Sequence, residues 1–184
     1  MIEVLRAGFC DLVMDQGRSG WGSLGVPMGG AADPTALAAA NRLVGNDANA
    51  AGLEITLAGP TLRFPLGGMA AFTGASFAAS RSNGIPVAWN ETLVLEAGET
   101  LSLGQAHAGC RCWLAFAGGI AVPPVLGSRS TFLPASFGGM QGRALRVGDA
   151  SVLGAATSEV RLLRARPPFI EPDLPLRVLA GPQV

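Results

Sequence analysis

The segment Gly127–Thr131 combines an arginine with neighbouring hydroxyl side chains. It reads GSRST, so Arg129 stands between Ser128 and Ser130. A guanidinium offers a planar fork of charge-assisted donors, and adjacent hydroxyls can orient a bound oxyanion. The segment therefore predicts a site for a carboxylate or a phosphate. A turn whose hydroxyls cap the local backbone, with the arginine in solvent, is the alternative interpretation.

A glycine-rich loop over Gly17–Ala32 is the second place where chemistry could occur. Its only charged side chain is Arg18. Glycine adopts backbone conformations with positive φ and allows a ligand to approach the main chain closely. The loop thus predicts a surface for a small polar molecule, with Arg18 and Arg129 as two anion-binding residues. A long irregular connection remains the alternative.

Other side chains that often perform catalysis are scarce. All 13 basic residues are arginines, so the chain has neither a P-loop lysine nor a lysine nucleophile, and it has no tyrosine. The single histidine, His107, lies in a turn-like GQAHAG context without a nucleophile-elbow motif. The remaining candidates are the carboxylates of Asp15, Asp33 and Glu54.

His107, Cys110 and Cys112 resemble three metal ligands, but a fourth ligand is missing. In the strand-like run CRCWLAFAG, Cys110 and Cys112 fall on the face of Leu114 and Phe116, which is otherwise apolar. We therefore expect buried structural thiols and no metal site. With Cys10 the chain has three cysteines, an odd number that does not suit a disulfide framework.

One helix is clearly predicted after the glycine-rich loop. Asp33 suits the N-cap and Pro34 the first helical position, and Gly45 suits the left-handed residue that follows a helix. Leu37, Ala40, Asn41 and Val44 fall on one face. A buried amide needs hydrogen-bond partners, so Asn41 either ties the helix to the glycine-rich loop or contacts a ligand.

The rest of the chain predicts short strands separated by glycine-containing turns. The expected strands are Gly52–Leu57, Met69–Phe72, Thr92–Glu96, Thr100–Leu103 and Arg111–Ala117. Their spacing indicates a mainly β fold, a barrel or sandwich with one or two short helices. With 49% hydrophobic and 14% charged residues in 184, the chain is long and apolar enough for a sizeable core.

Two long runs of sequence carry a resemblance to a known family. They are GVPMGGAADP with ANRLVGNDANAAGLEITLAGPTLRF, which together extend to Phe64, and AGGIAVPPVLGSRSTFLPASFGGMQGRALRVGD at Ala117–Asp149. In this order they resemble the amino-terminal half of the allophanate hydrolase subunit 2 family. That family includes the C subunit of bacterial ATP-dependent 5-oxoprolinase, and it is similar to the carboxyltransferase domain of biotin-dependent urea carboxylase. The resemblance implies a cyclophilin-like β fold.

The resemblance also implies which residues form the site. It favours the site interpretation of the GSRST segment, with Asp15, Arg18 and Arg129 as the expected catalytic residues. The expected substrate-binding residues are Gly25, Val26, Pro27, Gly29, Gly30, Asn41, Ser128 and Ser130. This chain has Gly29 where members usually have serine, and Leu12–Asp15 where they often have Thr-Thr-Val-Gln-Asp. Both departures remove polar groups from the loop.

The implied activity is ATP-dependent hydrolysis of a small amide or lactam such as 5-oxoproline. An allophanate hydrolase subunit 1-type protein would be the partner, and ATP would activate the carbonyl as an acyl phosphate. A first alternative is carboxyl transfer to a urea-like amide, with biotin carried by a partner. A second is a non-catalytic module that antagonises a kinase-inhibitor protein.

The resemblance further divides the chain into a β-rich first half (1–165), a proline-rich linker (166–175) and the start of a second half (176–184). The second half would begin near Gly181–Gln183, so we expect the chain alone to be inactive.

The 13 acidic residues balance the basic ones, which gives no general attraction for nucleic acid or anionic membranes. The low charged fraction predicts an apolar surface buried against another chain, either a partner or a second copy. No signal peptide or membrane span is evident, so we expect a cytoplasmic protein.

Overall fold

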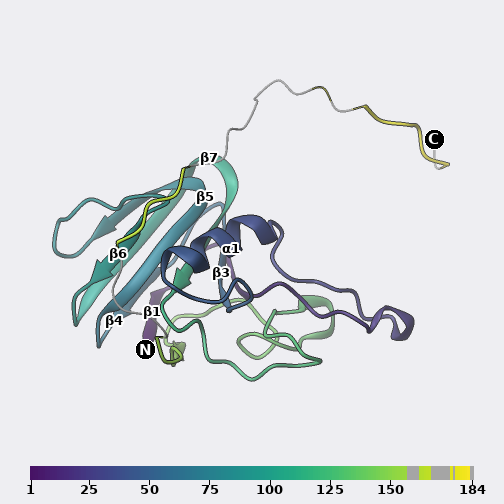
Figure 1. Cartoon of the computed structure of the whole chain (residues 1–184), viewed down its shortest axis with the longest axis horizontal. Coiled ribbons are helices and arrows are strands. Elements are labelled where there is room, and N and C mark those ends of the chain that lie inside the picture. The colour runs from purple at the N-terminus through teal and green to yellow at the C-terminus, as the bar shows by residue number, and fades with distance from the viewer. Residues whose placement is uncertain (157–161, 167–174, 176, 183–184) are drawn as a thin grey trace.

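The fold is mainly β, as the strand spacing predicts, with one α-helix on the outside of a curled sheet (Figure 1). The computed structural model describes residues 1–156, 162–166, 175 and 177–182. Its strands are β1 (Ile2–Arg6), β2 (Cys10–Met14), β3 (Gly52–Thr56), β4 (Thr61–Phe64), β5 (Gly68–Arg81), β6 (Thr92–Leu95), β7 (Glu99–Phe116) and β8 (Ala150–Ser151). The helices are α1 (Pro34–Leu43) and the short 3₁₀ turns η1 (Gly22–Leu24) and η2 (Leu133–Ala135).

Strand β7 organises the sheet because its 18 residues pair with three other strands. The first part of β7 is antiparallel to β4 and the last part to β3, whereas β5 runs antiparallel along the other edge. Beyond these pairs, β2 joins β3, β1 joins β4, β8 joins β1 and β6 joins β5. The ends of β2 and β7 thereby fix where the loops that follow them begin.

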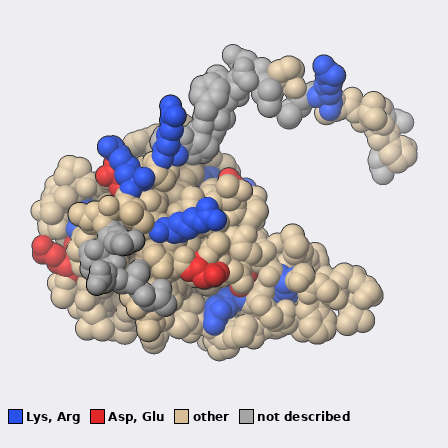
Figure 2. Space-filling model, viewed as in Figure 1, with Lys and Arg blue, Asp and Glu red and all other residues tan. Residues whose placement is uncertain are grey.

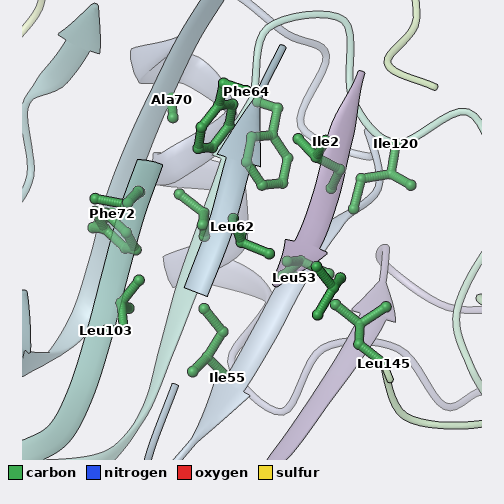
Figure 3. Close-up of a cluster of buried hydrophobic side chains, with 14 of the residues drawn as sticks. Ile2, Leu53, Ile55, Leu62, Phe64, Ala70, Phe72, Leu103, Ile120 and Leu145 are labelled. Atoms are coloured by element: carbon green, nitrogen blue, oxygen red, sulfur yellow. The ribbon is translucent and has the colours of Figure 1, made fainter. Parts of the chain in front are cut away.

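The main core fills the inside of the curl, where buried side chains of the strands β1 to β7 meet, as Figure 3 shows in part. Phe64 and Phe116 lie with ring centroids 5.9 Å apart, and Phe72 stacks on Trp89. Leu53 and Leu114 are fully buried among them. This apolar interior stabilises the sheet that positions the loops.

Helix α1 covers the outer face of β5 and β7 and begins as predicted. The Asp33 carboxylate accepts a hydrogen bond from the Ala36 amide at 2.9 Å, and Pro34 occupies the first helical position. The buried side of the helix packs on Met69, Ala71 and Ala115, which point away from the main core. Gly45 follows the C-cap with a left-handed φ of 75°.

We predict that replacing Asp33 with alanine lowers the free energy of unfolding by about 1 kcal/mol, because the first turn of α1 loses its cap. Serine or asparagine at this position should retain most of the stability, since both side chains can accept the same hydrogen bond. Urea denaturation of the three variants measures the effect. Unchanged stability in all three, together with lost activity, would instead show that the carboxylate is functional.

The predicted strands are found, but the expected Thr100–Leu103 and Arg111–Ala117 strands are parts of β7. His107 is therefore an exposed strand residue, which corrects the turn expected there. Cys112 is buried as predicted, whereas Cys110 is exposed. The reason is an irregularity in the β5–β7 register, near Gly109 with its φ of 81°, that breaks the alternation expected for a regular strand.

The domain division predicted near the carboxyl end falls largely on residues outside the described ones. Residues 167–174 of the expected linker and residues 176, 183 and 184 of the expected second half lie outside the described residues. Within the described part of the chain, no helix is long and apolar enough to cross a membrane.

Candidate functional site

The two segments singled out in the sequence meet in the structure, joined through Asp15. This residue directly follows β2 and opens the glycine-rich loop, while Ser128–Ser130 belong to the long irregular segment between β7 and β8. The hydroxyls of Ser128 and Ser130 both donate to Asp15 Oδ1 at 2.6 Å. The same oxygen accepts from the Gly17 amide at 2.8 Å, and Oδ2 accepts from the Arg129 amide at 2.6 Å. We call this cluster the Asp15 joint.

Further hydrogen bonds tie the two segments together around the joint. The Asp15 amide donates to Ser130 Oγ at 2.8 Å, and the Thr131 amide and hydroxyl both donate to the Val13 carbonyl. Asp15 is 2% exposed, so its carboxylate is sequestered from water. With four donors on two oxygens, Asp15 is suited to hold the two loops in place, and proton transfer would first require breaking these bonds.

Arg18 crosses the joint as a buried cation. Its side chain is 1% exposed, Nη2 donates to the Ser130 carbonyl at 2.5 Å, and Nε lies 3.4 Å from the Val125 carbonyl. The guanidinium carbon lies 4.8 Å from the centre of the Phe137 ring. Burial lowers the pKa of Arg18, and the Asp15 charge opposes this shift. Nη1 has no hydrogen-bond partner among the described residues.

Arg129 is half-buried and lies at the edge of the same joint. Its Nε donates to the Val122 carbonyl at 2.9 Å, which fixes the direction of the side chain. Its amide is one of the donors to Asp15. Ser128 Oγ accepts from the Ser130 amide, as the turn interpretation of the GSRST segment expects, but both serine hydroxyls donate to distant Asp15. The anion-binding role of partly exposed Arg129 stays a prediction.

The glycine-rich loop forms a narrow neck that carries a projecting tip (Figure 1). The neck is closed by the Arg18 amide, which donates to the Met28 carbonyl, and by the Ala31 amide, which donates to the Asp15 carbonyl. Gly30 packs so closely on the Gln16 main chain that a Cβ would clash with it. A hydrogen bond from Trp21 Nε1 to the Leu126 carbonyl, 3.1 Å long, anchors the tip to the other loop.

The predicted binding residues of this loop occupy different parts of it. Gly25 and Pro27 are exposed at the tip, Val26 is half-buried there, and Gly29 and Gly30 lie in the neck. Gly25 ends η1 in a left-handed conformation, with a φ of 76°. Only the neck residues reach the Asp15 joint, where a Cβ on Gly29 would lie 3.4 Å from Arg18 Nη1.

Asn41 is directed to a different loop. Its Nδ2 donates to the carbonyls of Ala50 at 2.8 Å and Ala48 at 3.4 Å, and its Oδ1 accepts from Asn46 Nδ2. These bonds join α1 to the turn that leads into β3. Asn41 therefore has a structural role, but it ties the helix to residues 46–50 and not to the glycine-rich loop. The structure therefore brings Asp15, Arg18, Ser128, Arg129 and Ser130 together, and Asn41 serves the frame around them.

Glu54 is one of the three candidate carboxylates, and the structure gives it a positioning role that the sequence pattern does not reveal. It is 4% exposed on β3, where Oε2 accepts from the Ala32 amide at 2.7 Å and Oε1 lies 3.2 Å from Arg111 Nε. It thus fixes the carboxyl end of the glycine-rich loop, as Asp15 fixes its start. A buried acid within the apolar run GLEIT was the available signal, because a buried charge requires nearby partners.

A separate open groove of about 390 Å³ lies on the sheet, lined by residues of β1, β4, β5 and β7 that include Arg6 and Ser102. None of the predicted site residues lines it. The described residues contain no cluster of three or more histidine, cysteine or acidic side chains that could hold a metal ion.

Comparison with known proteins agrees with the family resemblance. Residues 24–184 match the family described as carboxyltransferase domain, subdomain A and B. The chain is 45% identical over 155 residues to the C subunit of 5-oxoprolinase from Escherichia coli K12. This match covers 84% of this chain and 49% of that protein. It is 38% identical over 174 residues to the urea amidolyase of Lachancea kluyveri, which covers 94% of this chain and 9% of that protein.

Solved structures agree as well. The crystal structure of Kluyveromyces lactis urea carboxylase matches with a TM-score of 0.80 and 39% identity, over 85% of this chain and 14% of that one. The chain thus spans about half the length of the bacterial relative and a small part of the fungal ones. Because the match includes most of the residues and the fold, this protein belongs to the carboxyltransferase domain A and B family, in agreement with the predicted likeness to allophanate hydrolase subunit 2.

Proposed function

We propose that this chain contributes to an ATP-dependent hydrolase of a small amide or lactam, of the 5-oxoprolinase type, together with an allophanate hydrolase subunit 1-type partner. The single observation that carries the proposal is the 45% identity to the C subunit of Escherichia coli 5-oxoprolinase over 84% of the chain. The name of that relative describes one subunit of an enzyme, so we infer that this chain also works within a multi-subunit complex.

The Asp15 joint supports this proposal because it can position groups precisely. Hydrolysis of an activated amide places negative charge on the carbonyl oxygen, and fixed donors stabilise that charge. Arg129 is the partly exposed cation at the joint, and its Nε and amide bonds fix it in place. In this proposal Arg129 and the main chain of Gly29 and Gly30 contact the substrate, and Asp15, Ser128 and Ser130 position them.

We place ATP mainly on the partner. A triphosphate requires several donors and positive charges, yet the chain has no lysine, and Arg18 at the joint is buried with Nε and Nη2 directed at carbonyls. The nucleotide would supply an acyl phosphate, whose leaving group is far better than an amide. The residues of this chain would orient the small substrate beside it.

The projecting tip offers a surface for the partner. Residues 19–29 contain no charged side chain, and the large apolar side chains of Leu24 and Met28 are 72% and 63% exposed. The projection drawn at the right of Figure 1 is correspondingly uncharged in Figure 2. Exposed apolar residues gathered on a projection are typical of a protein contact. We expect the partner to bury them.

A second candidate function is carboxyl transfer to a urea-like amide, with carboxybiotin carried by a partner. The structural match to Kluyveromyces lactis urea carboxylase favours it, with a TM-score of 0.80. A chain without lysine cannot itself carry biotin on a lysine side chain, so the biotin would arrive from elsewhere. The same joint would then hold the urea-like amide.

The test measures ATP hydrolysis with the chain, a subunit 1-type protein and 5-oxoproline, beside carboxybiotin-dependent carboxylation of urea. We expect ATP hydrolysis that depends on 5-oxoproline and on both proteins, and none from the chain alone. Arg129→Ala should reduce apparent substrate affinity by at least about tenfold, since a charge-assisted contact is lost. Arg63→Ala is the matched control, because Arg63 pairs with Glu3 on the exposed side of the sheet.

Other results of this assay would favour the alternatives. Carboxylation of urea without lactam-dependent ATP hydrolysis would favour the carboxyltransferase. Tight association with the partner, without turnover of either substrate, would favour the non-catalytic regulatory module. Lactam-dependent ATP hydrolysis by the chain alone would overturn the proposed need for a partner.

A further inference from the structure

Nη1 of Arg18 is a buried donor at the edge of the Asp15 joint. The Arg18 side chain is 1% exposed, and Nη1 has no hydrogen-bond partner among the described residues. Buried polar groups in folded proteins are nearly always paired, and a guanidinium has five N–H donors to satisfy. An unpaired donor at the centre of a predicted site therefore indicates an acceptor that the described residues do not supply.

Among the residues that the structure describes, the charge of Arg18 also has no direct counterion. Its other nitrogens face the carbonyls of Ser130 and Val125, which are neutral. In the described part of the chain, no carboxylate oxygen lies within 4.0 Å of this guanidinium. Asp15 is the charge that acts on Arg18, but its oxygens accept from two hydroxyls and two amides. An external anion would therefore complete both the hydrogen bonding and the charge balance.

The surroundings of Nη1 show from which side such an anion would come. A Cβ built on Gly29 would lie 3.4 Å from Nη1, and no other heavy atom beyond the adjoining residues lies within 4 Å of that point. Gly29 is exposed and has a φ of 60°. The Phe137 ring covers the face of the guanidinium, and buried Gly138 lies beside Nη2. On this side, Nη1 therefore lies beside the exposed main chain of Gly29.

We propose that Arg18 Nη1 binds the carboxylate of a small substrate at the open side of Gly29, with the glycine main chain moving aside. This inference rests on the proposed function and deepens it, because it assigns to Arg18 the recognition of the carboxylate that 5-oxoproline bears. A neutral urea-like amide leaves the positive charge uncompensated. Since Nη1 is the only nitrogen available, the contact is made through one nitrogen, which suits a compact monoanion better than a polyphosphate.

The closing experiment observes Arg18 directly by NMR, in the chain labelled with ¹⁵N-arginine. The Nε–H resonance of Arg18 is assigned by its loss in Arg18→Lys. The probes are 5-oxoproline, 2-pyrrolidinone, which is the same ring without the carboxylate, and inorganic phosphate. We expect 5-oxoproline to shift this resonance and to bind at least about tenfold more tightly than 2-pyrrolidinone. A difference of this size corresponds to the contribution of one charge-assisted hydrogen bond to the affinity.

A second variant keeps Arg18 intact, so it does not depend on whether Arg18→Lys folds. Asparagine tolerates positive φ, and the side-chain oxygen of Gly29→Asn can accept from Nη1. This variant should weaken 5-oxoproline binding about tenfold more than it weakens 2-pyrrolidinone binding. Gly20→Asn is the matched control, because Gly20 also has a positive φ, 90°, and open space around its Cβ position.

The outcomes separate this inference from the proposed function. Lactam-dependent ATP hydrolysis with an unmoved Arg18 resonance and an unaffected Gly29→Asn would overturn the inference alone. A shifted resonance and carboxylate preference without any turnover would retain the inference and contradict the hydrolase. A stronger response to phosphate than to 5-oxoproline, or no response to any probe, would overturn the carboxylate assignment.

Discussion

Replacing Asp15 with alanine is expected to lower the free energy of unfolding by about 3 to 5 kcal/mol. The change leaves the Ser128 and Ser130 hydroxyls and the amides of Gly17 and Arg129 without their shared acceptor. Each unsatisfied buried donor costs about 1 to 3 kcal/mol, and rearrangement of the hydroxyls recovers part of the sum. The loss includes the tie between two loops that lie more than 100 residues apart in sequence.

Urea denaturation measures this effect, with Asp47→Ala as the matched control. Asp47 is exposed and accepts one main-chain hydrogen bond, from the Asn49 amide, so we expect its loss to cost less than about 1 kcal/mol. Asp15→Asn should lie between the two, since one oxygen remains and the amide nitrogen cannot accept. If Asp15→Ala retained stability yet abolished turnover, the carboxylate would be catalytic and its role as a positioning residue would be wrong.

The helix and its ends could be predicted because they depend on local chemistry. Asp33, Pro34 and Gly45 each act within a few residues of their own position, through a cap, a fixed φ and a left-handed conformation. The same local rules misjudged β7. Gly104, His107 and Gly109 look like turn residues in sequence, but pairing with β5 over nearly the whole strand outweighs their weak propensity.

The residue types of the site could also be predicted, whereas their arrangement could not. Asp15 and Ser130 are 115 residues apart, and no local pattern shows that their side chains lie within hydrogen-bonding distance. Nor does sequence distinguish an arginine in solvent from one directed at carbonyls. Arg18 appeared to be a loop cation available to ligands, yet it is among the largest fully buried side chains of the protein. Burial is a property of the assembled loops, so only the tertiary structure shows it.

Asp11 is another buried acid, but removing its charge is expected to raise the stability of the protein, whereas removing that of Asp15 is expected to lower it. It lies on β2 and is 1% exposed, with Oδ2 accepting from the Gly8 amide at 2.6 Å. Oδ1 has no hydrogen-bond partner among the described residues. Burial raises the pKa of Asp11 to about 6, from its ordinary 3.8, and the Gly8 hydrogen bond only partly opposes this shift. Asp11 therefore binds its proton more tightly in the folded protein than in the unfolded chain.

We predict that Asp11→Asn raises the free energy of unfolding at pH 7.5 by about 2 to 3 kcal/mol. A raised pKa means that the protonated form contributes stability that is fully present below about pH 3.8 and is lost as the pH rises through about 6. The difference of about two pKa units corresponds to this energy at 1.36 kcal/mol for each unit. Asparagine retains an acceptor for the Gly8 amide and removes the buried charge, so the gain should disappear near pH 3.5.

Asp149→Asn provides a control with the opposite sign. The hydrogen bond from Arg143 lowers the pKa of Asp149, so its charge contributes stability that is present above the ordinary pKa and lost in acid. Denaturation of both variants from pH 3.5 to 7.5 should therefore show curves that diverge from wild type in opposite directions as the pH rises. A destabilised Asp11→Asn at pH 7.5 would mean that the ionised carboxylate makes an essential interaction, since removing an unfavourable buried charge cannot have that effect.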